Sequence, residues 1–207
     1  NQAILSGANF ATVRSDDPET PEFGDATITT ISLPDRIPDT GFAPSRKTEL
    51  PLQTEKNAYR ELGSVWMEIP SQNLKATIVG VPLTDQGWQV DWLNRDVGYL
   101  QGTAFPSRPG NSVLTAHVYD SNGNPGPFVN LGKLIWGRQI FVHAFGSRYV
   151  YEVRSVQWFT DPENTAAFGH EEKSWLTLVT CRGYDEKSDS YRWRTIVRAV
   201  LVKVEAE

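Results

Sequence analysis

The hydrophobic pattern of the chain changes near residue 60. From about Glu61 onward, short runs rich in Val, Ile, Thr and aromatic residues alternate with segments that contain Gly, Pro, Asn or Asp. This is the pattern of β-strands joined by turns. The runs that predict strands are eight: 65–69, 74–81, 89–93, 112–119, 139–145, 148–158, 175–181 and 191–204. Eight short strands favour a closed barrel or a sandwich, and one short helix is expected at 127–134, where proline stands near the start.

Residues 1–60 have a different texture. They hold six of the thirteen prolines and many acidic residues, and only the run 26–32 resembles a strand. Proline-rich segments without a hydrophobic period are typical of extended linkers. We therefore divide the chain into an extended arm, 1–60, and one all-β domain, 61–207.

Composition excludes several classes of protein. The 207 residues carry a net charge of −5, which argues against a generic nucleic-acid binder. Hydrophobic residues make up 39% of the chain, too many for wholesale disorder, and no apolar run approaches the ~18–20 residues that cross a bilayer. The single cysteine excludes an intramolecular disulfide and a cysteine-rich zinc site.

Two segments carry part of a metal-binding motif. The segment 120–124 has the first three odd positions of a calcium loop, but Pro125 replaces the required glycine and Leu131 replaces the bidentate glutamate. An Asn-Gly turn explains it better. The segment 170–172, His-Glu-Glu, has no second histidine four positions on, as a zinc-protease helix requires. No metal ligand and no cofactor site is predicted.

The three histidines have different surroundings. Alternation puts His143 on the same strand face as Phe141 and Phe145, which favours a core position. His170 lies in a polar loop and is expected to be solvated. His117 ends an apolar run and precedes a turn-rich segment, so we expect it at the rim of the barrel, where strand becomes loop.

Cys181 is either a buried small hydrophobic residue or a working thiol. It ends a predicted strand and is followed by Arg182 and Gly183, where we expect the chain to leave the sheet. Arg194 stands thirteen positions later, at the distance that a hairpin needs to place it beside Cys181. A thiol near cationic groups is more reactive, an imidazole can protonate a leaving amine, and a guanidinium can stabilise an oxyanion. Such a set suits acyl transfer through a thioester.

These residues carry a resemblance to a known family. Thr177-Leu178-Val179-Thr180-Cys181 matches the Thr-Leu-x-Thr-Cys signature of sortases, the cysteine transpeptidases of bacterial cell surfaces. Leu114-Thr115-Ala116-His117 is similar to the family's histidine segment, although many sortases have glycine where this chain has Ala116, and Arg194 has the spacing of the sortase arginine. The resemblance covers about residues 62–205.

The resemblance implies an eight-stranded sortase barrel with one or two short helices, and it implies a reaction. Cys181 would attack the Thr–Gly carbonyl of a Leu-Pro-x-Thr-Gly-like sorting signal, His117 would be the acid and base, and Arg194 would clamp the oxyanion and the substrate. Further residues expected at the substrate are Thr180, Ala116 and Arg182, and the loops 158–174 and 182–190 are expected as substrate contacts. Arg192 and Arg198 share a strand face with Arg194 and are alternative clamps, although solvated or salt-bridged side chains are the favoured interpretation of both.

The resemblance also implies partners and a location. Surface proteins with C-terminal sorting signals would donate the acyl group, and an amine from a cell-wall precursor or a pilin lysine would accept it. No nucleic acid and no cofactor is implied, and calcium assistance is left open. The native protein is expected at the outer face of the bacterial membrane, tethered at its N-terminal side.

The arm contains a motif of the same form. Ile37-Pro38-Asp39-Thr40-Gly41 reads as a sorting motif with Ile in place of Leu. The alternative is a turn, because Pro, Asp and Gly are common turn formers. Our hypothesis is that the motif residues Ile37, Pro38, Thr40 and Gly41 occupy the chain's own or a neighbour's substrate groove, as an inhibitory pseudo-substrate or a self-processing site.

Two other functions compete with the transpeptidase. A peptidoglycan-acting thiol hydrolase or L,D-transpeptidase also uses Cys and His on a β scaffold, but its nucleophile follows a Ser-x-Gly pattern, and this chain has Leu-Val-Thr before Cys181. The third candidate is a non-catalytic surface-binding module in which Cys181 is packed in the core. A reactive, accessible thiol favours catalysis over the module.

Overall fold

The computed structural model describes residues 4–7, 10–14, 21, 33–50 and 64–207. They fall into two compact units, 1–33 and 34–207. In the first unit, β1 (Ile4–Gly7) pairs antiparallel with β2 (Phe10–Arg14), a hairpin that the sequence pattern did not predict. The strand-like run at 26–32 lies outside the described residues. Residues 34–50, which belong to the predicted arm, are part of the second unit.

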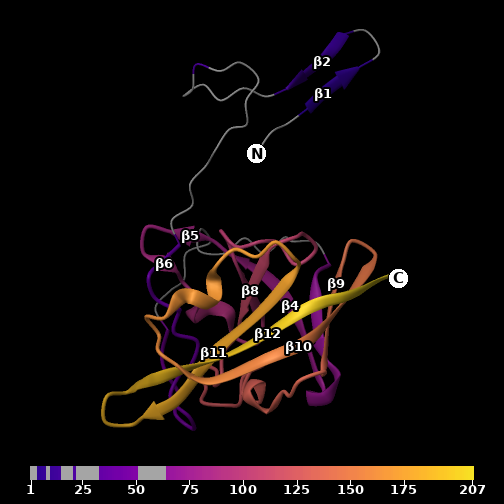
Figure 1. Ribbon diagram of the computed structural model, residues 1–207. Coiled ribbons are helices and arrows are strands. Elements are labelled where there is room, and N and C mark those ends of the chain that lie inside the picture. Colours follow the sequence, from indigo (N-terminus) through magenta and orange to yellow (C-terminus); the bar gives the residue numbers. More distant parts are fainter. Residues whose placement is uncertain (1–3, 8–9, 15–20, 22–32, 51–63) are drawn as a thin grey trace. The chain divides into compact units, whose positions relative to one another are not determined.

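The second unit is built on a closed barrel of eight strands (Figure 1), as predicted. Their order around the barrel is β10-β12-β11-β8-β7-β4-β3-β9, with β9 pairing back to β10. Only the pairs β4–β7 and β8–β11 are parallel. The strands are β3 (Trp66–Ile69), β4 (Leu74–Val81), β7 (Val97–Leu100), β8 (Asn111–Thr115), β9 (Gln139–Ala144), β10 (Ser147–Thr160), β11 (Trp175–Asp185) and β12 (Ser190–Ala206). A two-stranded hairpin, β5 (Leu83–Thr84) and β6 (Gly87–Trp88), stands apart from the barrel sheet.

The strand expected at 89–93 is wrong. This segment forms a 3₁₀ turn, η3 (Asp91–Leu93), because its two buried apolar residues, Val90 and Leu93, are spaced three apart, and the amide of Leu93 donates to the carbonyl of Val90 at 3.1 Å. The eighth barrel strand is β7 instead. A Cβ at Gly98 in β7 would lie 2.7 Å from a methyl group of Val81, so glycine is required there by close packing.

The helix expected at 127–134 is also wrong. Only η4 (Leu131–Lys133) is helical, and it is a 3₁₀ turn. Phe128, Leu131 and Leu134 are all buried, and their spacing of three residues matches the 3.0 residues per turn of a 3₁₀ helix. The other helical turns are η2 (Pro70–Gln72) and η5 (Thr165–Phe168), and none of the described residues forms an α-helix.

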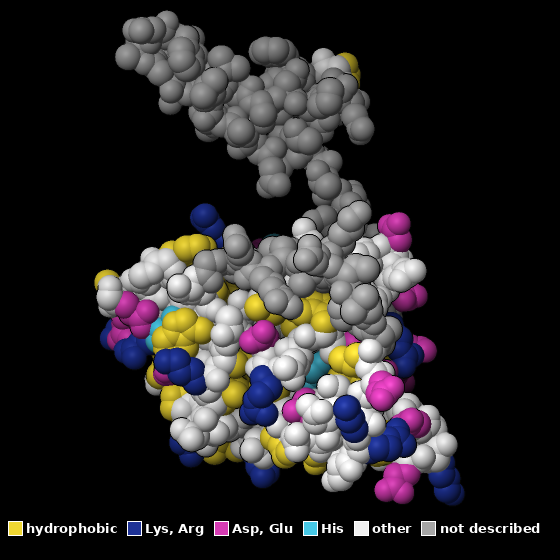
Figure 2. Space-filling model, turned by 180° about the vertical axis from the view of Figure 1, so that it is seen from behind, with side chains coloured by type: hydrophobic (Ala, Val, Ile, Leu, Met, Phe, Trp, Pro, Cys, Tyr) yellow, Lys and Arg dark blue, Asp and Glu magenta, His cyan; other side chains and the backbone are white. Residues whose placement is uncertain are grey.

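The barrel interior is the main hydrophobic core. Side chains from all eight strands fill it, together with those that η4 and its flanking residues contribute. Tyr151 is fully buried there, and its hydroxyl donates to the carbonyl of Pro106 at 2.5 Å. Outside the core, Figure 2 shows Lys and Arg side chains intermingled with Asp and Glu on the face that it presents. The barrel is therefore a rigid scaffold on which strand ends and loops can hold a site.

Unequal strand lengths leave one edge of the barrel open. β8 ends at Thr115, so its pairing with β11 stops at Val179, whereas β11 and β12 continue as a hairpin to Asp185 and Ser190. The expectation that the chain leaves the sheet directly after Cys181 is therefore wrong, because β11 runs four residues further. Cys181 still lies at a rim, since at its level β11 has a strand neighbour on one side only.

Candidate active site

Cys181 and Arg194 are brought together by the β11–β12 hairpin. They are directly opposite each other in the antiparallel register, as their spacing predicted, so their side chains stand on the same face of the sheet. Both are buried, and Arg194 is the largest fully buried side chain among the described residues. Its guanidinium donates to the backbone carbonyls of Tyr191 and Trp193 at 3.3 and 3.2 Å. These bonds hold the cation in place beside the thiol.

His117 stands two residues beyond β8, at the same rim. The parallel register of β8 and β11 pairs residues that are 64 positions apart, and the hydroxyl of Thr180 continues it by donating to the carbonyl of Ala116 at 2.8 Å. The next step of that register places His117 at the level of Cys181. Thr180 and Ala116, both expected near the substrate, thus join the two strands behind the catalytic candidates.

The imidazole of His117 is buried, and no side chain bonds to it. Neither ring nitrogen has a well-formed hydrogen bond within the described residues, although backbone groups of Asp91, Thr40 and Val90 interact with the ring. The ring of Phe42 lies 5.0 Å away, centroid to centroid. Burial lowers the pKa of His117, and the backbone and carboxylate of Asp91 oppose this effect. Burial in turn raises the pKa of Asp91, while His117 lowers it. The sequence analysis missed Asp91 because its segment resembled a strand instead of a turn that carries a carboxylate to the histidine.

Residues 37–41 lie across these side chains. The carbonyl of Pro38 accepts from Arg194 Nε at 3.1 Å, and the Asp39 carboxylate is 3.2 Å from Arg194 Nη2. The thiol of Cys181 donates to Asp39 Oδ1 at 3.1 Å, and the amide of Thr40 donates to the sulfur at 3.1 Å. The arm motif therefore contacts both Cys181 and Arg194. Asp39 was not among the predicted site residues, because the third position of a sorting motif is unspecified.

The groove is shaped closely to this segment. Ile37 and Thr40 are fully buried, and the amide of Ile37 donates to the carbonyl of Pro162 at 2.7 Å. At Gly41 the backbone passes between two walls: an added Cβ would lie 2.6 Å from a methyl group of Val118 and 2.7 Å from the ring of Tyr191. Any side chain at position 41 would displace one of them. The groove thus accepts glycine at this position and an apolar side chain four positions earlier.

Burial changes the chemistry of the thiol. It raises the pKa of Cys181 to about 12, the positive charge of Arg194 acts in the opposite direction, and the Asp39 carboxylate raises the pKa further. At neutral pH the sulfur is therefore a protonated thiol. Part of this burial comes from the arm, because the atoms closest to the sulfur include Asp39 Oδ1 and the amide of Thr40.

The other predicted substrate residues have separate places. The guanidinium of Arg182 lies over the ring of Phe159 at 5.0 Å, and both line a cavity of about 460 Å³ that reaches Cys181. Arg192 pairs with Asp185, and Arg198 pairs with Glu171. Of the three arginines on β12 that could act as a clamp, only Arg194 contacts the arm motif within the described residues, and its charge also acts on Cys181.

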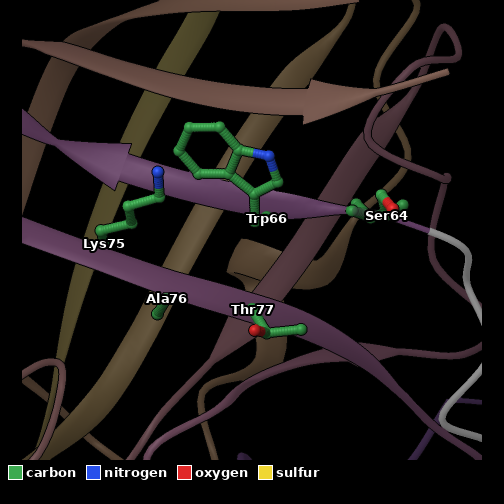
Figure 3. Close-up of a pocket in the computed structure, with 6 residues that line it drawn as sticks. Ser64, Trp66, Lys75, Ala76 and Thr77 are labelled. Carbon is green, nitrogen blue, oxygen red and sulfur yellow. The ribbon is translucent and has the colours of Figure 1, made fainter. Parts of the chain in front are cut away.

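A second surface pocket lies on the other side of the barrel. It has a volume of about 540 Å³ and is lined by Ser64 and residues of β3 and β4, where the Lys75 amine stands 3.8 Å from the centroid of the Trp66 ring (Figure 3). In the order around the barrel, β3 is four strands from β11 in either direction. None of the predicted catalytic residues lines this pocket.

The described residues contain no group of three or more His, Cys, Asp or Glu side chains placed to hold a metal ion. Within the same residues, no helix has both the length and the apolar character of a membrane span.

Comparison with known proteins identifies the family. The sortase domain model matches residues 67–202. Similar solved structures are a Clostridium perfringens sortase D5 transpeptidase (21% identity, 72% of this chain and 84% of that chain, TM-score 0.56) and sortase C-1 of Actinomyces oris (26%, 69% and 76%, 0.54). A third is a C. perfringens sortase C solved with the C-terminal cell wall sorting motif (28%, 67% and 69%, 0.54). No curated protein sequence matches this chain. The chain belongs to the sortase family of transpeptidases.

Proposed function

We propose that this sortase cleaves a sorting signal of the form Leu/Ile-Pro-x-Thr-Gly between Thr and Gly and transfers the acyl group to an amine through a thioester on Cys181. The observation that carries the proposal is the seating of Ile37–Gly41 across Cys181 and Arg194. A groove that takes this segment in this register has the shape and the polar partners for a sorting signal of the same sequence.

The residues support a two-step acyl transfer. In the first step the thiol of Cys181 gives its proton to His117 as the sulfur attacks the threonine carbonyl, and Arg194 stabilises the negative oxygen of the tetrahedral intermediate. His117 then passes that proton to the departing glycine amine as the Thr–Gly bond breaks. In the second step an amine attacks the thioester, loses its proton to His117 and releases the thiolate. His117 suits this role, since no side chain of the described residues is hydrogen-bonded to its ring nitrogens.

The arm acts in this proposal as an inhibitory pseudo-substrate. The arm fills the groove. Asp39 accepts a hydrogen bond from the thiol of Cys181 and forms an ion pair with Arg194, so it occupies the two side chains that a substrate needs. Substrate binding requires the arm to leave the groove. The apparent affinity for every peptide is therefore reduced in proportion to the fraction of molecules whose arm is out of the groove.

The geometry favours inhibition over self-cleavage. The carbonyl oxygen of Thr40 accepts from the amide of Val118 at 2.9 Å, whereas the amide nitrogen of Thr40 faces the sulfur. An attacked carbonyl would present its carbon to the sulfur and its oxygen to Arg194. The arm is therefore held with the wrong group at the nucleophile, and it remains intact.

The biological setting follows from the family. We infer that the donors are surface proteins with C-terminal sorting signals and that the acceptor amine comes from a cell-wall precursor or a pilin lysine. The reaction as written uses only side chains of this chain, with no cofactor, metal or nucleic acid. The proposed location is the outer face of the bacterial cell membrane, with an N-terminal tether.

A peptide-library cleavage assay tests the proposal. The parent chain and its Gly41→Ala variant, whose arm no longer fits between Val118 and Tyr191, are each compared with the same chain carrying Cys181→Ala. We expect cleavage between Thr and Gly, faster in the Gly41→Ala chain, and no cleavage in either Cys181→Ala chain. Equal cleavage with and without Cys181 would remove this residue from the mechanism, and intact mass after incubation with hydroxylamine reports any cut at Thr40–Gly41.

A further inference from the structure

The arm continues past the motif along a second, more open surface. The amide of Phe42 donates to the carbonyl of Tyr119 at 3.1 Å, and the hydroxyl of Tyr191 donates to the carbonyl of Phe42 at 2.9 Å. Beyond them, the amides of Ser45 and Thr48 donate to the carbonyls of Gly123 and Ser121 at 2.9 and 2.7 Å. Most of these bonds use backbone groups of the arm, so they do not depend on its sequence.

One arm side chain is recognised by its charge. Arg46 Nη2 lies 2.5 Å from Asp189 Oδ1 and 3.4 Å from the hydroxyl of Tyr184. Asp189 also accepts from Tyr184, and this bond together with Arg46 lowers the pKa of the aspartate. An ionised carboxylate and a phenol at the turn end of the β11–β12 hairpin thus form an acceptor pair for a guanidinium.

The loop that carries the backbone acceptors is preformed. The carboxylate of Asp120 accepts from the amides of Asn122 and Asn124 at 2.9 and 3.0 Å, which fixes the turn 120–124 that resembled part of a calcium loop in the sequence. Gly123 has a φ of 77°, and an added Cβ there would lie 2.3 Å from the backbone nitrogen of Arg46. The turn is therefore shaped for a peptide that runs against it.

We propose that this surface, formed by residues 119–123 with Tyr184 and Asp189, is the binding site for the part of a sorting signal that follows the cleaved bond, and that it selects a basic residue at the sixth position after that bond. The inference rests on the proposed function. In the arm, Thr40 and Gly41 stand at the cleavage position, and Arg46 is the sixth residue after it. A donor peptide has to turn its threonine carbonyl toward the sulfur, which the arm does not do. Beyond that bond its glycine meets the same walls as Gly41, and the peptide leaves the active site by the same exit.

The expected selectivity is modest, because the ion pair is open to water. The side chains of Arg46 and Asp189 are 56% and 58% exposed. Exposed pairs of this kind change equilibria by about two- to fivefold, and salt screens them. The selectivity is measured as the ratio of kcat/KM between peptides. Closure of the arm reduces kcat/KM for all peptides by the same factor, so it leaves this ratio unchanged.

The test compares three peptides on the full chain. Ile-Pro-Asp-Thr-Gly-Phe-Ala-Pro-Ser-Arg is measured against the same peptide ending in Gln and in Glu. We expect kcat/KM to fall in the order Arg, Gln, Glu, with about a two- to fivefold span at low salt that shrinks in high salt. Asp189→Asn should abolish the order, because asparagine keeps the positive φ of 51° at this position but not the charge.

Asp185→Asn is the matched control. It removes one negative charge from the same hairpin, but the Asp185 carboxylate pairs with Arg192 and has no contact with residues 33–50 of the arm, so the order of the peptides should persist. Equal rates for the three peptides on the parent chain, or an unchanged order in Asp189→Asn, would overturn the inference and leave the proposed function standing. If no peptide is cleaved at all, the proposed function is wrong and the inference is wrong with it.

Discussion

Two buried histidines on opposite sides of the barrel have opposite surroundings. His143, on β9, stacks on Trp66 with 3.6 Å between ring centroids, and its Nδ1 lies 2.5 Å from the carboxylate of Glu207. His117, beyond β8, has no side chain bonded to either ring nitrogen within the described residues, and it lies against the arm. β8 and β9 are four strands apart in either direction. Burial is therefore common to both histidines, and the difference is that a carboxylate holds one ring nitrogen of His143 whereas no side chain holds either nitrogen of His117.

Alanine substitution of each histidine should have the largest and most clearly different effects. His117→Ala should lower kcat/KM for a sorting peptide by about 10²–10⁴, the usual contribution of a general acid–base group. His143→Ala should leave kcat/KM within about twofold. It should lower the free energy of unfolding by about 1–3 kcal/mol, because the bond to Glu207 and the stack on Trp66 are lost. Peptide cleavage and denaturant unfolding measure the two effects.

The contrast can fail in either direction. A large loss of activity in His143→Ala, with its stability intact, would connect the β3–β9 side of the barrel to the reaction. Normal turnover in His117→Ala would remove the imidazole from the mechanism and leave it as a packed side chain.

Two arginines on β12 give the next comparison. Arg194 is fully enclosed and bonds to three carbonyls, whereas Arg198 pairs with Glu171 at the surface. Lysine cannot reproduce the forked contacts of a guanidinium. Arg194→Lys should therefore cost about 10²–10³ in kcat, the usual loss of one oxyanion donor, while Arg198→Lys should change kcat by less than about twofold. Comparable losses in both would mean that the guanidinium of Arg198 is needed as much as that of Arg194, and the assignment of Arg194 as the particular oxyanion donor would be wrong.

The sequence predicted the positions of the candidate catalytic residues better than it predicted the turns. The bounds of β4 agree with the predicted 74–81, because the run is long, apolar and ends before a proline. Cys181 and Arg194 are register partners because a hairpin converts a spacing of thirteen residues into a contact. The strand predicted at 89–93 is wrong because its buried apolar residues, Val90 and Leu93, are three apart and suit a 3₁₀ turn. β7, which contains Gly98, was not among the predicted runs.

Long-range contacts were beyond the reach of the pattern. Asp39 is 142 positions from Cys181, and nothing in the local sequence indicates that its carboxylate meets the thiol and Arg194. Asp91 beside His117 is of the same kind. Both are aspartates, a residue type that is usually exposed, and only the fold of the closed barrel brings them to the site. The arm also affects the reactivity of Cys181, which was expected to distinguish an enzyme from a binding module. While the arm covers the sulfur, even a catalytic cysteine would react slowly with an alkylating reagent.

Loosening the arm should therefore sharpen the comparison between a packed and a working thiol. Gly41→Ala places a methyl group against Val118 and Tyr191, so the arm should open and alkylation of Cys181 by iodoacetamide should accelerate by about tenfold or more. Gly169→Ala is the matched control, because its new Cβ meets only a carbonyl oxygen at 3.3 Å, away from the arm. An unchanged rate in Gly41→Ala would mean that the barrel itself, and not the arm, encloses the sulfur.

The smallest expected effect concerns the charge at Asp39. Burial and this carboxylate raise the pKa of Cys181 to about 12, and only the thiolate reacts, so alkylation of the parent chain should keep rising with pH above 9. In Asp39→Asn the negative charge is gone, the thiol pKa falls, and the rate at pH 8 should increase about threefold; Asp35→Asn, on the same arm, should leave it unchanged.

The same shift couples arm closure to pH. A thiol whose pKa is raised in the closed state holds its proton more tightly there, so closure is fully favoured below the ordinary thiol pKa of about 9 and weakens as the pH rises toward about 12. Asp39→Asn should flatten this dependence. A profile that is the same in both chains would mean that the carboxylate does not reach the sulfur in solution, and the arm would then close on Cys181 through its backbone alone.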